Sequence, residues 1–234
     1  MKYDILLFDA DNTVLDFNSA ESQALQRAFL QCNLPFDQHT LQVYRKHNVK
    51  EWQRYEKEEI TRDEVLVNRF AFTFEELQLP FDRRVCHLYE QYLHDGFDVV
   101  PFAEEVLQRL QKVCRLYIVT NGVLSIQNSR MKGSGLEKYF EKRFVSEEIG
   151  FPKPKKQFFD YCFAHIPDVD KSKTLLIGDS LSSDILGGIN AGIDTCWYNP
   201  EGKNNQSDIK PTYEIEDLRR LYPIVQGVRP SCLS

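Results

Sequence analysis

No stretch of the sequence approaches the roughly 20 consecutive apolar residues that a membrane-spanning helix needs. The first residues also lack the hydrophobic segment of a secretion signal, since an acidic side chain, Asp4, comes almost at once. Positive charge is scarce as well: 29 Lys and Arg stand against 35 Asp and Glu, a formal charge of −6. Proteins that bind nucleic acid commonly neutralise many phosphates with cations. We therefore expect neither a membrane nor a nucleic-acid polymer as a partner.

Closely spaced cysteines are missing too. The cysteines form no CxxC pair, and none has a histidine at the spacing of a zinc site. Disulfides persist mainly outside the reducing cytoplasm. We therefore expect a cytoplasmic protein with reduced, mostly structural thiols. They are Cys32, Cys86, Cys114, Cys162, Cys196 and Cys232.

The remaining composition is that of a folded globular chain. Its 234 residues are 42% hydrophobic and 27% charged, enough for one large domain or one domain with an insertion. The first expected strand is Tyr3–Asp9 and the next is Leu116–Thr120, a gap far longer than one crossover helix requires. The gap has helical spacing and cap signals, with Ser19 before one helix and Thr61 opening a capping box. We expect an all-helical cap domain at residues 16–96, inserted into a core domain formed by residues 1–15 and 97–234.

After the insertion, helix and strand patterns alternate. This alternation predicts an α/β fold: a Rossmann-like parallel sheet with helices on both faces. The expected elements are a helix from Pro101, the strand to Thr120, a helix Ser125–Met131, a short strand Phe144–Val145, a helix after Pro154, a strand Thr174–Asp179, a helix Ser183–Ala191, a strand Asp194–Tyr198 and a polar loop Asn199–Pro211.

Polar residues suited to one reaction follow three of these strands. They are Asp9 and Asp11 after the first strand, Thr120-Asn121-Gly122 after the second, and Asp179 with Asp184 after a later one. In open parallel sheets, ligands bind beyond the carboxyl ends of the strands. Clustered acids there need a partner, and Mg²⁺ favours carboxylates together with a substrate phosphate.

These residue types suggest phosphoryl transfer. Of Asp9 and Asp11, one can face phosphorus as a nucleophile and the other can address the leaving group. Lys153, before a helix, could neutralise charge, and Thr120 with the amides of Asn121 and Gly122 could bind phosphoryl oxygens. Each signal alone also suits a plain turn, strand end or surface lysine. Their joint occurrence in order favours an active site.

The sequence resembles the haloacid dehalogenase superfamily over essentially its whole length. The matching motifs are Asp9-Ala10-Asp11-Asn12-Thr13-Val14-Leu15, Val119-Thr120-Asn121-Gly122, Lys153-Pro154 and Gly178-Asp179-Ser180-Leu181-Ser182-Ser183-Asp184. The resemblance implies that Asp9 is the nucleophile and Asp11 the general acid and base. It implies that Mg²⁺ is held by Asp9, the main-chain carbonyl of Asp11 and Asp179, with Asp184 in support. Thr120, Asn121 and Lys153 would hold the phosphate, and the helical insertion would be a mobile lid.

A closer resemblance, to the small pyrimidine 5′-nucleotidases, lies in Asn121-Gly122, Gln127, Gly135-Leu136 and Tyr139-Phe140. It implies a 5′-nucleotidase whose partner is a small phosphorylated metabolite, a nucleoside monophosphate. The enzyme would hydrolyse it through an aspartyl phosphate. Leu136, Tyr139 and Phe140 fit core packing better than substrate contact.

The shared metal site also predicts the order of the sheet. The strands ending at Asp9 and Asp179 must be neighbours for their carboxylates to share an ion. We therefore expect the Thr120 and Phe144 strands on one side of the first strand, and the Asp179 and Trp197 strands on the other, joined by right-handed crossovers.

Other activities remain open at this stage. One is a phosphatase of the same superfamily acting on sugar phosphates or other small metabolites. A 2-haloacid dehalogenase is disfavoured by Asp11, because a departing halide needs no proton. A phospho-accepting signalling module is disfavoured by the chain length and the insertion. The cap should set the choice of substrate. A solvated basic helix face with buried aromatics is nevertheless the plainer interpretation of its candidates, Arg45, Lys46, Trp52, Arg54 and Tyr55. The sequence carries no indication of oligomeric state.

Overall fold

A computed structural model describes residues 1–228 of the chain. The chain divides into two compact units, each described by itself below. One unit, the core unit, combines Met1–Asp16 with the chain from Asp98 onward, and the other, the helical unit, is Phe17–Phe97. No helix within residues 1–228 is both long enough and apolar enough to cross a membrane.

The core unit contains a parallel sheet whose strands lie in the order β3-β2-β1-β4-β5-β6. The predicted α/β fold is confirmed, and so is the place of the first strand between the strands of Thr120 and Asp179. In the register of the sheet, Phe8 lies beside Ile118 on β2 and beside Ile177 on β4. The strands are β1 (Ile5–Phe8), β2 (Arg115–Thr120), β3 (Lys142–Val145), β4 (Thr174–Gly178), β5 (Asp194–Tyr198) and β6 (Tyr213–Ile215).

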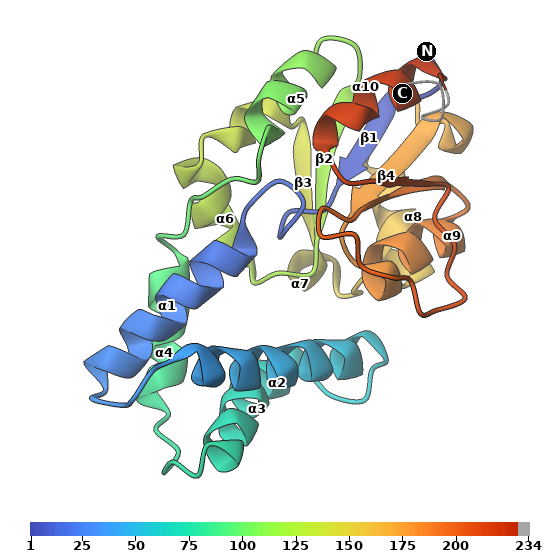
Figure 1. Ribbon diagram of the computed structural model, residues 1–234. Helices are drawn as coiled ribbons and strands as arrows, with labels where there is room; N and C mark the ends of the chain where they lie inside the picture. The colour runs from blue at the N-terminus through green and yellow to red at the C-terminus, as the bar shows by residue number, and fades with distance from the viewer. Residues whose placement is uncertain (229–234) are drawn as a thin grey trace. The chain divides into compact units, whose positions relative to one another are not determined.

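Helices cover both faces of this sheet (Figure 1). Side chains alternate along each strand, so Leu6 and Phe8 pack with α5, α6 and α10, whereas Ile5 and Leu7 pack with α8 and α9. The helices are α5 (Ala103–Leu110), α6 (Leu124–Gly133), α7 (Ser146–Ile149), α8 (Lys156–Ala164), α9 (Leu186–Ala191) and α10 (Leu221–Gln226), with short turns η1 (Leu136–Tyr139), η2 (Lys171–Lys173), η3 (Leu181–Ile185) and η4 (Leu218–Arg220). Leu136 and Tyr139 are buried as packing residues on the face of the sheet that α5, α6 and α10 cover.

Some predicted boundaries are wrong. Helix α5 begins at Ala103 rather than Pro101, because Phe102 adopts a left-handed conformation, with φ of 64°, that no helix continues through. The helix predicted from Ser183 opens as a π-helical turn, η3, before α9. Strand β6 was not predicted, since three residues after a polar loop carry too little periodicity.

The helical unit consists of α1 (Phe17–Gln31), α2 (Gln38–Glu56), α3 (Arg62–Glu76) and α4 (Arg84–Leu93). The predicted capping box is present: Thr61 accepts a hydrogen bond from the Glu64 amide, and the Glu64 side chain accepts one from the Thr61 amide. Ser19 lies inside α1 instead of capping it. Buried aromatic rings fill this unit, with Tyr44 against Phe70 and Tyr89.

The cysteines of residues 1–228 are free and buried. Burial raises the pKa of several of these thiols, for example that of Cys86 to about 11. They therefore resemble small apolar core residues rather than reactive thiolates. Cys232 lies outside the described residues.

Candidate active site

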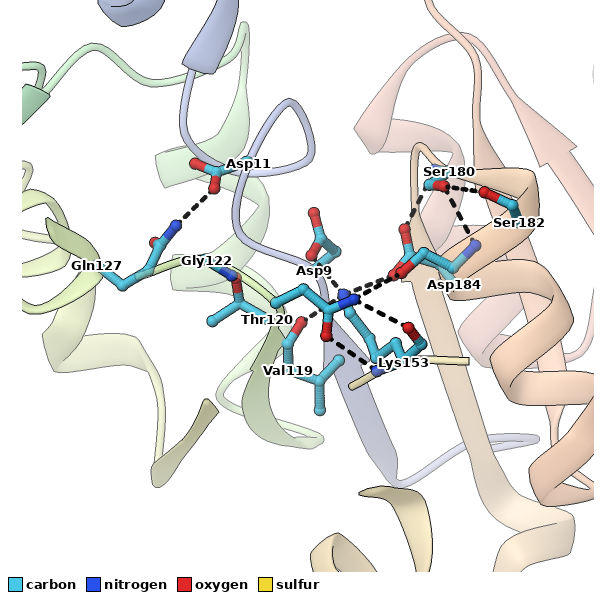
Figure 2. A network of polar contacts seen from close by, with 12 residues as sticks. Asp9, Asp11, Val119, Thr120, Gly122, Gln127, Lys153, Ser180, Ser182 and Asp184 are labelled. Atoms are coloured by element: carbon cyan, nitrogen blue, oxygen red, sulfur yellow. Dashed lines mark hydrogen bonds and ion pairs between the residues drawn. The ribbon is translucent and has the colours of Figure 1, made fainter. Parts of the chain in front are cut away.

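The carboxyl ends of β1, β2 and β4 bring the predicted residues together (Figure 2). Asp9 follows β1, and its amide donates to the Ile177 carbonyl on β4 at 2.8 Å. Thr120 ends β2 and Asp179 follows β4. Because the three strands are parallel neighbours in register, their ends share one edge of the sheet.

Lys153 is the centre of this cluster. Its side chain is buried, and Nζ lies 2.6 Å from Asp9 Oδ1, 2.7 Å from Asp184 Oδ1 and 2.8 Å from the Val119 carbonyl oxygen. An ammonium group has three N–H donors, and this geometry gives a partner to each. Burial alone would lower the pKa of Lys153, but the carboxylates of Asp184 and Asp9 outweigh it and raise the pKa above its ordinary value. The lysine is therefore a fixed positive charge beside Asp9.

Asn121 positions the main chain of Lys153. Its Nδ2 donates to the Lys153 carbonyl oxygen and its Oδ1 accepts from the Lys153 amide, each at 2.9 Å. Nδ2 also donates to Ser183 Oγ at 3.4 Å, so the Asn121 side chain is engaged and the main-chain amide is the donor left for the phosphate contact expected from the sequence. The Thr120 hydroxyl accepts from the Gly122 amide at 3.0 Å, so its own O–H remains available as a donor.

Asp9, Asp179 and Asp184 each offer a carboxylate oxygen within 4.8 Å of the others. Two hydrogen bonds support this acidic cluster. The Trp197 side chain donates from Nε1 to the Asp179 main-chain carbonyl at 2.8 Å, and the Ser180 amide donates to Asp184 Oδ2 at 3.1 Å. A glycine precedes Asp179 for a steric reason. A Cβ atom at Gly178 would lie 2.3 Å from the Asp184 carboxylate.

The protonation of these acids indicates a place for a cation. Burial, and then the neighbouring carboxylates, raise the pKa of Asp9 well above its ordinary value despite Lys153. Burial and Asp184 raise the pKa of Asp179 to about 7. Such crowded acids are stabilised as anions by a bound divalent ion, and an all-oxygen donor set suits a hard one. The residues present therefore fit Mg²⁺.

Asp11 lies apart from this cluster. Figure 2 shows its carboxylate turned toward Gln127, whose Nε2 donates to Asp11 Oδ2 at 2.5 Å. Arg130 forms an ion pair with the other oxygen, Oδ1. Sequence reasoning noted Gln127 only through a family resemblance and missed Arg130. The sequence signal that could have found Arg130 is its spacing of three residues from Gln127, which places both on one face of the helix after the Thr120 strand.

The basic candidates in the helical unit are engaged by acids of that unit. Arg45 Nε lies 2.7 Å from Glu21, Lys46 Nζ lies 2.6 Å from Glu76, and Arg54 lies 3.0 Å from Glu51. These three ion pairs fit the plainer reading of a salt-bridged helix face. Trp52 and Tyr55 form an edge-to-face aromatic pair, with ring centroids 5.7 Å apart.

Comparison with known proteins agrees with this geometry. The family of haloacid dehalogenase-like hydrolases matches residues 3–192. The chain belongs to this family. YfnB of Bacillus subtilis, a hydrolase of the family, is 42% identical over 96% of both chains. The pyrimidine 5′-nucleotidases PynA of Streptococcus pneumoniae and YjjG of Escherichia coli are 37% and 34% identical, each over 94% of this chain and over 94% and 97% of their own lengths.

A solved structure supports the same placement. The crystal structure of YfnB bound to magnesium matches 96% of this chain and 99% of its own, with a TM-score of 0.91. Together these comparisons make the chain a phosphatase of the haloacid dehalogenase superfamily that is similar to members of its 5′-nucleotidase branch.

Proposed function

We propose that the protein is a Mg²⁺-dependent phosphatase of nucleoside 5′-monophosphates that acts through an aspartyl phosphate on Asp9. The observation that carries the proposal is the buried contact of Lys153 with Asp9, next to the acidic cluster at the strand ends. Lys153 Nζ donates a hydrogen bond to Asp9 Oδ1 at 2.6 Å, and we therefore assign the attack on phosphorus to the other oxygen, Oδ2. Mg²⁺, held by Asp9, Asp179 and the Asp11 carbonyl with Asp184 in support, would supply positive charge for the phosphoryl oxygens.

The residues of the chain account for both chemical steps. In the first, an Asp9 oxygen forms a bond to phosphorus, the bond to the ester oxygen breaks, and Asp11 gives that oxygen a proton. In the second, Asp11 takes a proton from water, which attacks phosphorus, releases inorganic phosphate and restores Asp9. The Thr120 hydroxyl and the Asn121 amide would donate to the phosphoryl oxygens through both steps, and Lys153 would supply positive charge beside them. The Gly122 amide instead donates to the Thr120 hydroxyl.

We expect nucleoside 5′-monophosphates to be better substrates than sugar phosphates. The similarity to PynA and YjjG, both pyrimidine 5′-nucleotidases, supports this choice. The measurement is kcat/KM with thymidine and uridine monophosphates against hexose and triose phosphates, with Mg²⁺ present. Higher values for the sugar phosphates would reject the nucleotidase assignment and favour the sugar-phosphate alternative.

Activity should disappear on chelation and return with Mg²⁺, and the stabilisation by Mg²⁺ should grow with pH. The folded-state pKa of Asp179, about 7, lies above that of an unfolded aspartate, so its contribution to stability is complete below about pH 4 and is lost as the pH rises through 7. Mg²⁺ binds the deprotonated form and should restore the loss.

The measurement is the increase in Tm on adding Mg²⁺ to chelator-treated protein at pH 5, 6, 7 and 8. Asp179→Asn is the matched control, since it keeps the shape of the side chain without the titration and should flatten the pH dependence. Equal increases at pH 5 and pH 8 in the unmodified protein would contradict the assignment of these acids to the metal. So would full activity after exhaustive chelation.

A further inference from the structure

Asp11 is held at both of its carboxylate oxygens by residues of one helix. Gln127 donates to Oδ2 and Arg130 pairs with Oδ1. The main chain of Asp11 is fixed as well, in a turn where the Val14 amide donates to the Ala10 carbonyl oxygen at 3.0 Å and Asn12 has a left-handed φ of 56°. With the backbone set by this turn, the two donors determine where the carboxyl group points.

Stability does not explain this arrangement. The side chain of Arg130 is completely buried, whereas that of Asp11 is 25% exposed. Replacing a whole buried ion pair by apolar side chains of similar volume is often neutral or stabilising, so the pair by itself is weak evidence for a stabilising role. Gln127 is buried too, and its Oε1 has no hydrogen-bond partner within residues 1–228. A buried polar atom without a hydrogen-bond partner lowers the stability of the fold, so its presence suggests a role other than stability.

The helix that carries both donors also follows the expected phosphate-binding segment. Helix α6 starts four residues after Thr120, the last residue of β2. Gln127 packs so closely on Gly122 that a Cβ atom there would lie 2.3 Å from Gln127 Nε2. The same helix therefore joins the segment for the phosphoryl oxygens to the orientation of Asp11.

We propose that Arg130 and Gln127 are positioning residues for the reaction, which hold the Asp11 carboxyl in the orientation used for proton transfer to the leaving group. The proposal rests on the proposed function, in which Asp11 is the proton donor. General acid catalysis requires the carboxyl group within hydrogen-bond reach of the leaving oxygen, so rotation about its side-chain bonds reduces the productive fraction. In this scheme neither residue contacts phosphorus or the ester oxygen, and both act through Asp11.

The test is Arg130→Met, which keeps the length and removes the guanidinium. With a nucleoside monophosphate, an alkyl ester, kcat should fall by about 10- to 100-fold, the range for groups that orient a reacting residue. KM should change by less than about twofold, since the phosphate contacts remain. The rate of nitrophenol release in the first turnover should fall by less than about threefold, since a good leaving group needs little protonation. Tm should fall only slightly, since the Asp11 carboxylate that loses its partner is 25% exposed and can be hydrated.

Further variants separate positioning from a structural role. Gln127→Met should show the same leaving-group pattern to a smaller extent, and it carries the test if Arg130→Met does not fold. Arg130→Lys should recover part of the loss. Lys132→Met is the matched control, because it removes one positive charge from an exposed position of the same helix and should keep wild-type rates with both esters.

Two outcomes would overturn the inference. One is an equal loss with both ester types, which is the signature of a structural role. The other is a leaving-group dependence in Asp11→Asn that neither Arg130→Met nor Gln127→Met reproduces. A failure of the proposed function is distinguishable, since the unmodified protein would then hydrolyse no phosphate ester, or Asp11→Asn itself would show no leaving-group dependence.

Discussion

Asp11→Asn is expected to lower kcat for nucleoside monophosphates by about 10²- to 10⁴-fold, the usual contribution of general acid and base catalysis. An alkoxide leaves poorly without a proton, and an asparagine amide cannot supply one. Nitrophenyl phosphate has a good leaving group, so its first step should be much less affected. Hydrolysis of the aspartyl phosphate should be slow with both esters, because the attacking water loses its base.

The variant should therefore release a burst of nitrophenol and accumulate the acyl phosphate, both of which rapid mixing and acid quenching can measure. Asp9→Asn is the control for this experiment. It lacks the nucleophile and should show neither the burst nor the intermediate, although the two asparagine variants remove the same charge only two residues apart. Equal losses with both esters and no burst would mean that Asp11 mainly organises the metal site, contrary to the role proposed for it.

Lys153→Met should reduce kcat/KM by about 10²- to 10³-fold, the effect of removing one group that stabilises transition-state charge. Both KM and kcat should change, because in the proposed mechanism the positive charge of the ammonium stabilises the phosphoryl oxygens of the bound ester and of the transition state. The variant also leaves Asp9 and Asp184 buried without their cation. The free energy of unfolding of the metal-free protein should fall by about 3–5 kcal/mol, the loss on removing one partner of a buried ion pair.

The measurements are steady-state kinetics with Mg²⁺ and urea unfolding with chelator. Lys112→Met, at an exposed position of the core unit, is the matched control and should change neither quantity appreciably. Unfolding in the presence of Mg²⁺ should show a smaller loss of stability than unfolding in chelator, since the ion then supplies positive charge to the same acids. A wild-type kcat/KM in Lys153→Met would remove Lys153 from the mechanism.

Local sequence patterns were sufficient for the fold and for the strand-end residues. A short apolar run that ends in an acid indicates a buried strand from a few consecutive residues alone. A capping box such as that of Thr61 and Glu64 likewise involves only four consecutive residues. The order of the sheet also followed, because an expected metal site shared by Asp9 and Asp179 required their strands to be neighbours, as they are. Strand β6 and the start of α5 were missed, since each depends on contacts or dihedral angles with no periodic signal.

The sequence by itself thus determined the α/β architecture and the placement of Asp9, Thr120 and Asp179 at one sheet edge. Only the tertiary structure decided what surrounds them: the burial of Lys153 between two carboxylates, and the attachment of Asp11 to Arg130, 119 residues further along the chain. A lysine or arginine is ordinarily exposed, and its own sequence neighbours say nothing of a distant acid. Such residues become buried when folding brings the opposite charge to them, which is a property of the topology rather than of any local segment.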